Sequence, residues 1–301
     1  MESFDEPLVS VVVPTYNRER LLCDTLRGLF KQDYRHLEII VVDQSARHES
    51  STEDFIRRHA QKIRYSQMEK PSLPEARNQG AQLSAGRIVL FVDDDVIPDP
   101  HLVSAHAAAY SSHTVGGVAG RRTVPGLEEL PQPVGVIDAW GRHVSNFSSL
   151  VPTSVDWASG CNMSFRRDLI FRAGLFEPKF LGSAAYEDVD FCFRLRRLGY
   201  EIRFEPRAHL IHLKAAEGGC SNRDLGYRYI YSAIHNMLLF ALRHFPLQAL
   251  PRLFAERLGA ATSYARQTRN PLVIIPLAAA FAQVFHSYVV ARRSLPREVR
   301  R

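Results

Sequence analysis

Three short apolar runs in the first hundred residues constrain the fold of this chain most strongly. They occupy residues 8–13, 37–42 and 87–92 and are rich in valine, isoleucine and leucine. Near-continuous apolar runs of this length are typical of parallel strands covered on both faces. Residues 21–30 and 74–83 lie between them and repeat apolar side chains at helical spacing. This alternation predicts an α/β fold with a mostly parallel central sheet and ligands bound at the carboxyl ends of its strands.

The remainder of the chain divides at about Ser221. Residues 121–152 are rich in proline, glycine and polar groups, which predicts a long, functional excursion rather than packed structure. Regular patterning then resumes, with a helix expected near residues 188–198 and a strand near 201–204. Beyond Leu225 the chain reads as helical throughout. We therefore expect an α/β domain over residues 1–220 and a helical segment over 221–301.

The helical segment is strongly basic. From Ser221 onward it contains 12 arginines, no lysine and three acidic residues, although the whole chain has a net charge of only +6. Such asymmetry favours an anionic partner. No nucleic-acid recognition motif accompanies the arginines, so we expect no nucleic acid, and a phospholipid surface fits better.

Residues 270–291 carry no formal charge and are long enough to cross a bilayer. Pro276, Gln283, His286 and Ser287 interrupt the apolar run, however. Three interpretations stay open: packing or self-association into a homo-oligomer, a helix lying in the membrane surface, and a membrane span. The four cysteines lack CxxC spacing and the N-terminus lacks a secretory pattern. This predicts a cytoplasmic protein, with peripheral attachment to the cytoplasmic face of a membrane as the alternative.

Polar clusters follow directly after each of the three apolar runs. The first contains Pro14, Tyr16 and Arg18, which offer an aromatic ring for base stacking and polar groups for a nucleoside. The second begins with Asp43, whose carboxylate suits a ring N–H such as that of uracil. The third is the acidic triplet 93–95. Because these strand ends should share one edge of the sheet, the clusters predict a single nucleotide-binding crevice.

The triplet Asp93, Asp94 and Asp95 suggests a divalent cation. Three adjacent carboxylates repel one another unless a cation neutralises them, and hard oxygen ligands suit Mg²⁺ or Mn²⁺. A diphosphate leaving group needs such a cation as well, because negative charge builds on its bridging oxygen. The alternative is that these acids only cap the turn before Pro98.

A second acidic group, Glu187, Asp188 and Asp190, opens a predicted helix. Acids in a first turn are stabilised by the helix dipole, which accounts for some of them. Their proximity to residues 182–183 and Tyr186, which suit a sugar acceptor, points to catalysis. We therefore interpret Asp188 as the base that deprotonates an attacking hydroxyl.

Two further kinds of side chain are candidates for the same site. Either His209 or His212 supplies an imidazole suited to a metal, although a structural role is the commoner one for a lone histidine. Arg77 begins a predicted helix, where it would meet phosphate or base, and a surface salt bridge is the alternative.

In this order, the clusters resemble family 2 glycosyltransferases with the GT-A fold. The resemblance runs from Val9 to about His212. It rests on six segments: VVVPTYNR, IIVVDQS, EARNQG, VLFVDDDVIPDP, ASGCNMSFRRD and YEDVDFCFRLRRLGYEIRFEPRAHLIH. The implied architecture has a Rossmann-like nucleotide-binding half.

The resemblance implies a role for each matching position. Nucleotide contacts are expected at Pro14, Tyr16, Arg18, Asp43, Arg77, Asp93 and Asp94. Metal ligands are expected at Asp95 and His212, and Asp188 matches the catalytic base. Contacts with the donor sugar or the acceptor are expected at Gly160, Asn162, Met163 and Glu187. The family often has two acids where this chain has Asp43 and Gln44, so Gln44 stays unassigned.

The implied reaction is metal-dependent and inverting, and it moves a sugar from a nucleoside diphosphate to an acceptor hydroxyl in one displacement. UDP-sugars are the favoured donors. The expected acceptor is a saccharide or a lipid-linked molecule, in polysaccharide or glycolipid synthesis. Two alternatives stay open. A sugar-phosphate nucleotidyltransferase would need a glycine-rich loop and a lysine after the first strand, where this chain has PTYNR. A non-catalytic binding protein of the same fold would have no need of Asp95, Asp188 and His212 together.

Overall fold

The structure is a computed structural model that describes residues 6–127, 133–139, 141–215, 218–219, 227–246, 255, 275 and 278–286. The chain divides into two compact units. The first consists of Met1–Ile137, His143–Pro178 and Glu187–Cys220. The second consists of Asp138–Arg142, Lys179–Tyr186 and Ser221–Arg301, so it takes in two short inner segments besides the C-terminal part.

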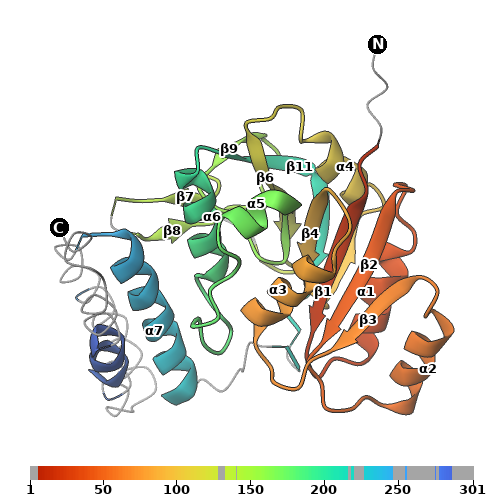
Figure 1. Cartoon of the computed structure of the whole chain (residues 1–301), viewed down its shortest axis with the longest axis horizontal. Helices are drawn as coiled ribbons and strands as arrows, with labels where there is room; N and C mark the ends of the chain where they lie inside the picture. Colours follow the sequence, from red (N-terminus) through yellow and green to blue (C-terminus); the bar gives the residue numbers. More distant parts are fainter. Residues whose placement is uncertain are drawn as a thin grey trace. The chain divides into compact units, whose positions relative to one another are not determined.

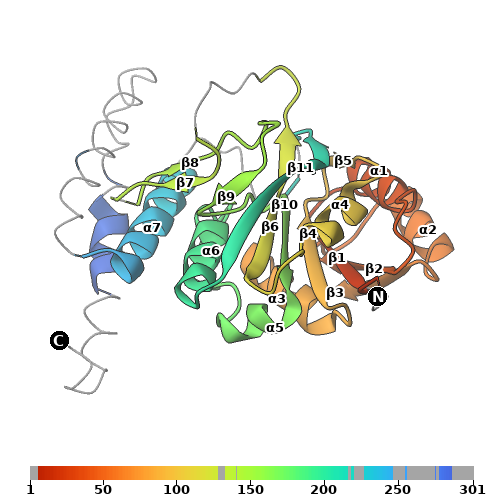
Figure 2. The ribbon, with the colours of Figure 1, turned by 90° about the horizontal axis from the view of Figure 1, so that it is seen from above.

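A nine-stranded sheet forms the centre of the first unit, with β9 paired to β11 and the other strands in the order β3-β2-β1-β4-β10-β6-β11-β5 (Figures 1 and 2). Its strands are β1 (Val9–Thr15), β2 (Leu37–Asp43), β3 (Ile63–Gln67), β4 (Ile88–Val92), β5 (Val96–Pro98), β6 (Val115–Thr123), β9 (Thr153–Val155), β10 (Asn162–Arg166) and β11 (Glu201–His212). A separate hairpin joins β7 (Val136–Ile137) to β8 (His143–Val144).

Six of the nine strands run in the same direction. β1 is parallel to β2 and β4, β2 is parallel to β3, and β6 is parallel to β11. β10 runs antiparallel between β4 and β6, and β5 and β9 run antiparallel to β11. The predicted α/β fold with a mostly parallel sheet is confirmed.

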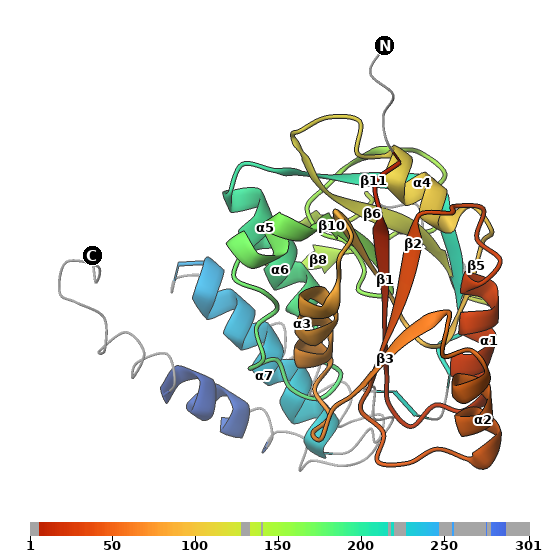
Figure 3. The same cartoon turned by 45° about the vertical axis from the view of Figure 1, so that its right-hand side comes forward.

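Helices cover both faces of this sheet (Figure 3). The helices of the first unit are α1 (Arg20–Leu29), α2 (Ser50–Arg58), α3 (Leu73–Leu83), α4 (Leu102–Ala108), α5 (Arg167–Arg172) and α6 (Glu187–Arg197). Every residue of β1 is buried. Val11 packs with Leu22 and Leu26 of α1 in one core cluster, whereas Val12 faces α3, where a Cβ on Gly80 would collide with it. Because successive side chains of β1 point to opposite faces of the sheet, this strand contributes to the core on each face.

Two expectations about the middle of the chain need correction. The stretch 121–152 is partly packed, because β6 continues to Thr123 and Phe147 is fully buried against the edge of the Trp157 ring. A single core aromatic among proline and glycine gives no periodic signal. The strand expected near 201–204 runs on to His212. Pro206 interrupts no pairing there, because it lies in a register shift of the ladder with β6.

The second unit contains α7 (Tyr227–His244). The Asn236 side chain is fully buried and bonds to both the backbone N–H and the backbone oxygen of Leu181, at 2.8 and 2.9 Å. The Tyr186 ring lies 5.5 Å from that of Phe240. Among the described residues, no helix combines the length and apolarity needed to cross a bilayer. Most of the uncharged run 270–291 lies outside the described residues, so the expected membrane contact and self-association stay predictions.

Candidate active site

The predicted clusters meet at one edge of the sheet. β1, β2, β4 and β11 end there, and the antiparallel strand β10 begins there. Consequently the turn after Thr15, the residues after Asp43 and Val92, and the end of β11 at His212 lie along the same rim. Parallel strands bring these positions together although they are far apart in sequence.

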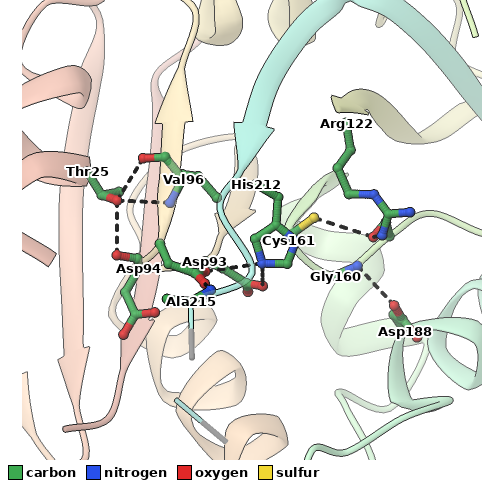
Figure 4. A network of polar contacts seen from close by, with 12 residues as sticks. Thr25, Asp93, Asp94, Val96, Arg122, Gly160, Cys161, Asp188, His212 and Ala215 are labelled. Carbon is green, nitrogen blue, oxygen red and sulfur yellow. Dashed lines mark hydrogen bonds and ion pairs between the residues drawn. The ribbon is translucent and has the colours of Figure 1, made fainter. Parts of the chain in front are cut away.

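A carboxylate and imidazole cluster lies at the centre of this rim (Figure 4). His212 Nε2 is 3.1 Å from Asp95 Oδ1 and 3.7 Å from Asp93 Oδ2. The second oxygen of Asp95 accepts the backbone N–H of Ala215 at 2.8 Å. Burial alone would lower the pKa of His212, but the hydrogen bond with Asp95 raises it to about 11. The two acids thus favour positive charge at this point of the rim.

This cluster fits a divalent cation. Carboxylate oxygens and an imidazole nitrogen form a donor set that Mn²⁺ accepts and that overlaps with the oxygen preference of Mg²⁺. The Nδ1 atom of His212 is buried without a hydrogen-bond partner, so the ring has a further nitrogen to offer. His209 lies apart from the cluster, with its Nε2 atom 3.0 Å from Thr123 Oγ1. Of the two candidate histidines, the structure favours His212 as the metal ligand.

Asp94 points away from the cluster. Its carboxylate accepts a hydrogen bond from Thr15 Oγ1 at 2.7 Å and lies 3.8 Å from Arg18 Nε. Burial raises the pKa of Asp94 to about 7, although the positive charge of Arg18 acts to lower it. The side chain has almost no exposed surface, and its expected contact with a nucleotide stays a prediction. Asp94 links β1 to the end of β4.

Arg18 is a buried cation at the rim. Only 4% of its side chain is exposed, and its Nε and Nη1 atoms have no hydrogen-bond partner. Its Nη2 atom lies 3.4 Å from Asp95 Oδ2. Gly219 packs against the Arg18 side chain, because a Cβ on Gly219 would lie 2.6 Å from Arg18 Nη2. The Gly219 N–H donates to the backbone oxygen of Tyr16 at 2.7 Å. A buried guanidinium with two unused nitrogens is suited to an anion such as phosphate.

An open cavity of about 550 Å³ lies at the ends of β1, β2 and β3. Tyr16, Gln44, Ser45, Gln67 and Glu69 contribute to its lining. Its volume lies in the range of small-ligand pockets. The aromatic ring of Tyr16 and the surrounding polar groups are of the kind expected for a nucleoside. Pro14 does not line the cavity, because it is buried within β1.

Asp43 is fully buried, and both of its oxygens are engaged. Oδ1 accepts the Ser45 N–H at 2.8 Å, and Oδ2 accepts from His48 Nε2 at 2.6 Å and from the Tyr65 hydroxyl. The expected bond from Asp43 to a base is therefore not available in this arrangement. Sequence reasoning missed His48 and Tyr65, because a histidine five residues after a strand and a tyrosine on the next strand carry no motif.

His48 makes stability depend on pH in a defined direction. Its hydrogen bond to Asp43, together with Glu19, raises the pKa of His48 from 6.5 to about 9. A folded-state pKa above the unfolded value stabilises the fold fully below pH 6.5, and this stabilisation is lost as the pH rises through 9. We expect His48→Gln to flatten the decline in unfolding free energy between pH 6.5 and 9, measured by urea denaturation. His113→Gln, an exposed site, is the control. Parallel pH curves for wild type and His48→Gln would contradict this.

Arg77 is a buried connector. Only 2% of its side chain is exposed, so a surface salt bridge does not fit its position, and its expected contact with a nucleotide stays a prediction. Its Nη2 donates to the Gly160 backbone oxygen at 3.1 Å and lies 3.5 Å from Asp93 Oδ1, and its Nη1 forms an ion pair with Glu187. Glu187 is also buried, and its expected contact with the donor sugar or the acceptor stays a prediction.

Asp188 remains accessible at the start of α6, where it is half-buried. Its Oδ2 accepts the Gly160 N–H at 2.9 Å, a bond visible in Figure 4. Arg77 and Asp188 therefore hold the two sides of the same peptide segment. A Cβ on Gly160 would lie 2.6 Å from Arg77 Nη2, so a larger residue there would displace the guanidinium.

Asn162 and Met163 are fully buried. Asn162 Nδ2 donates to the backbone oxygens of Arg121 and Ala208 at 2.9 Å, and its Oδ1 lies 2.8 Å from His106 Nε2. The expected contact of these two side chains with a sugar stays a prediction. They fix β10 in the sheet, and the small neighbouring residue Gly160 is the one that lies at the rim.

Comparisons with known proteins agree with this geometry. A family model described as Glycosyl transferase family 2 matches residues 10–170. Validoxylamine A glucosyltransferase from Streptomyces hygroscopicus subsp. limoneus is 33% identical over 111 residues, which are 35% of this chain and 24% of that protein. Glucosyl-dolichyl phosphate glucuronosyltransferase from Haloferax volcanii is 26% identical over 182 residues, 56% of each protein. The chain therefore covers about a quarter to about a half of the length of these relatives.

A solved structure resembles the fold over most of the chain. Mannosyltransferase PcManGT from Pyrobaculum calidifontis, in complex with GDP-Man and Mn²⁺, has a TM-score of 0.55 at 19% identity. The match covers 94% of this chain and 76% of that one. At this identity the likeness shows the fold alone, and it confirms the expected GT-A type of architecture.

Proposed function

This chain belongs to glycosyl transferase family 2, and on that basis we propose that it transfers a sugar from a nucleoside diphosphate to an acceptor hydroxyl with inversion at the anomeric carbon. One observation carries the proposal. The Asp93, Asp95 and His212 cluster lies at the same rim as the half-buried carboxylate of Asp188 and the cavity beside Tyr16. A base, a cation site and a nucleoside-sized cavity are the parts that such a transfer needs.

Asp188 would act as the base. The Gly160 N–H holds one of its oxygens, which fixes the direction of the carboxylate and leaves it accessible at the rim. Removing the proton of the acceptor hydroxyl would let its oxygen attack the anomeric carbon in one displacement, so the configuration would invert. No covalent sugar–enzyme bond is needed in this scheme.

The leaving diphosphate would be held by Arg18 together with the cation site. Arg18 offers two buried nitrogens without hydrogen-bond partners, which suit phosphate oxygens. Asp93, Asp95 and His212 would hold Mn²⁺ or Mg²⁺. When bound, the cation would offset the negative charge that develops on the leaving group.

The donor and the acceptor belong to the same proposal. UDP-sugars are the first donors to test, and the cavity lined by Tyr16 and Gln67 would take the nucleoside. We propose a saccharide or lipid-linked acceptor, as in polysaccharide or glycolipid synthesis, and the Haloferax volcanii relative, named for a glucosyl-dolichyl phosphate, supports a lipid carrier. The arginine-rich segment from Ser221 would suit contact with acidic lipid headgroups at the cytoplasmic face of a membrane.

Calorimetric titration tests this function directly. We expect the purified chain to bind one of UDP, GDP and dTDP in the presence of Mn²⁺ and to lose that binding in EDTA. Incubation with the matching nucleotide sugar should then release the nucleoside diphosphate when an acceptor is added. Failure to bind any of the three nucleotides with Mn²⁺ present would contradict the proposal.

Asp95→Ala is expected to weaken metal-dependent nucleotide binding. The substitution removes both the carboxylate that bonds to His212 and the acceptor for the Ala215 N–H. We expect the dissociation constant for the nucleotide with Mn²⁺ to rise at least about tenfold, or ~1.4 kcal/mol. Asp54→Ala, on the exposed face of α2, is the matched control. Unchanged affinity in the Asp95 variant would argue against its place in the cation site.

A further inference from the structure

A thiol lies beside the cation cluster. The Sγ atom of Cys161, a carboxylate oxygen of Asp93 and a ring nitrogen of His212 all lie within 4.8 Å of one another. They come from three places: the residue after β4, the turn before β10 and the last residue of β11. Figure 4 shows Cys161 against the His212 ring. Three ligand-bearing side chains within such a distance are able to share one ion.

The surroundings of Cys161 are polar. Its sulfur lies 3.4 Å from Ser159 Oγ, which in turn accepts a hydrogen bond from Arg122 Nη1 at 3.3 Å. The thiol also contributes to the raised pKa of His212.

The other two cysteines in the described part of the chain, Cys23 and Cys192, do not lie beside the cation cluster. Burial raises the pKa of both Cys23 and Cys192, and neither belongs to the group of potential metal ligands. Cys161 is only 3% exposed, so it faces the cluster rather than solvent. Its position is therefore specific to the cation site.

We propose that Cys161 binds the divalent cation as a thiolate, together with Asp93 and His212. The inference rests on the proposed function in one respect, since it concerns the same cation site. Coordination replaces the S–H bond by a sulfur–metal bond, and the thiol proton is released to solvent. Asp95 remains part of the same cation site, and its Oδ1 atom, 3.1 Å from His212 Nε2, also keeps that ring oriented.

A sulfur ligand changes which ions the site prefers. Thiolates are soft ligands that favour Co²⁺, Zn²⁺ and Cd²⁺ over Mg²⁺, whereas carboxylates favour hard ions. The site would therefore bind cobalt well and retain magnesium poorly. This differs from the all-oxygen and imidazole set that the sequence motifs predict.

Cobalt titration of the full chain without nucleotide tests the proposal. Co²⁺ bound to a thiolate gives an intense near-ultraviolet charge-transfer band, which oxygen and nitrogen ligands do not give. We expect this band in the wild-type protein, with protons released to solvent as cobalt binds. Cys161→Ser should abolish the band, whereas Cys23→Ser, a buried cysteine outside the cluster, should retain it.

Two results would overturn the inference: the absence of the band at saturating cobalt in the wild-type protein, or its persistence in Cys161→Ser. Circular dichroism checks that the serine variant is folded, and Cys161→Ala replaces it if it is not. Failure of the proposed function is distinguishable. A Cys161-dependent band without turnover of any nucleotide sugar upholds the ligand and rejects the transferase, whereas turnover without the band does the reverse.

Discussion

Asp188→Asn is expected to abolish sugar transfer while nucleotide binding stays close to that of the wild type. Asparagine has nearly the same shape, and its side-chain oxygen still accepts one of the two backbone N–H groups, those of Gly160 and Val189, that Asp188 accepts. It has no basic oxygen to take the proton of an attacking hydroxyl. Loss of a general base typically lowers the rate about 10²- to 10⁴-fold. Steady-state transfer rates and calorimetric titration with the nucleotide and Mn²⁺ measure the two quantities separately.

Asp168→Asn is the matched control for this variant. Asp168 also lies in the first turn of a helix, α5, and its side chain is 67% exposed. Removing a first-turn charge costs at most about 1 kcal/mol at an exposed site, so the control separates the helix-dipole contribution from catalysis. Transfer at the wild-type rate in Asp188→Asn would reject the base assignment. Loss of nucleotide binding would show that Asp188 acts mainly in the binding site.

The sheet was predictable where its strands are buried on both faces. β1 has an apolar signal because all seven of its residues are buried. β3 has none, since only Ile63 of its five residues is buried and the other positions face solvent or are half-buried. As an edge strand, β3 needs no apolar run. The sequence gives no clear signal for α2 either, because only Thr52 and Phe55 of this helix are buried.

The place of the site was predictable from the ends of the strands, but the partners of each side chain were not. The sequence places Asp43 at a strand end, and the structure shows that Tyr65, 22 residues later, takes one of its oxygens. Likewise Asn162 bonds to Ala208, 46 residues further on. A buried polar group must find a hydrogen-bond partner, and which distant residue supplies it depends on packing that leaves no local pattern.

Arg77→Met is expected to destabilise the fold strongly, which the nucleotide-contact interpretation would not predict. The variant leaves the Glu187 carboxylate, 4% exposed, without its ion pair, and Glu187 Oε2 already lacks a partner. It also removes the donor to the Gly160 oxygen. Breaking one side of a buried ion pair costs about 3–5 kcal/mol, so we expect a loss of that size in the unfolding free energy, measured by denaturant titration.

The double variant Arg77→Met with Glu187→Gln separates charge from packing. A neutral amide needs no counter-charge, so it should recover a large part of the stability lost in the single variant. Arg57→Met is the matched control, because the ion pair of Arg57 with Asp54 lies on the exposed face of α2, where such pairs contribute less than about 1 kcal/mol. Wild-type stability together with weakened nucleotide binding in Arg77→Met would mean that this arginine serves the ligand directly. A stability loss that Glu187→Gln relieves would instead show that Arg77 supports the site structurally, through its contacts with Asp93, Gly160 and α6.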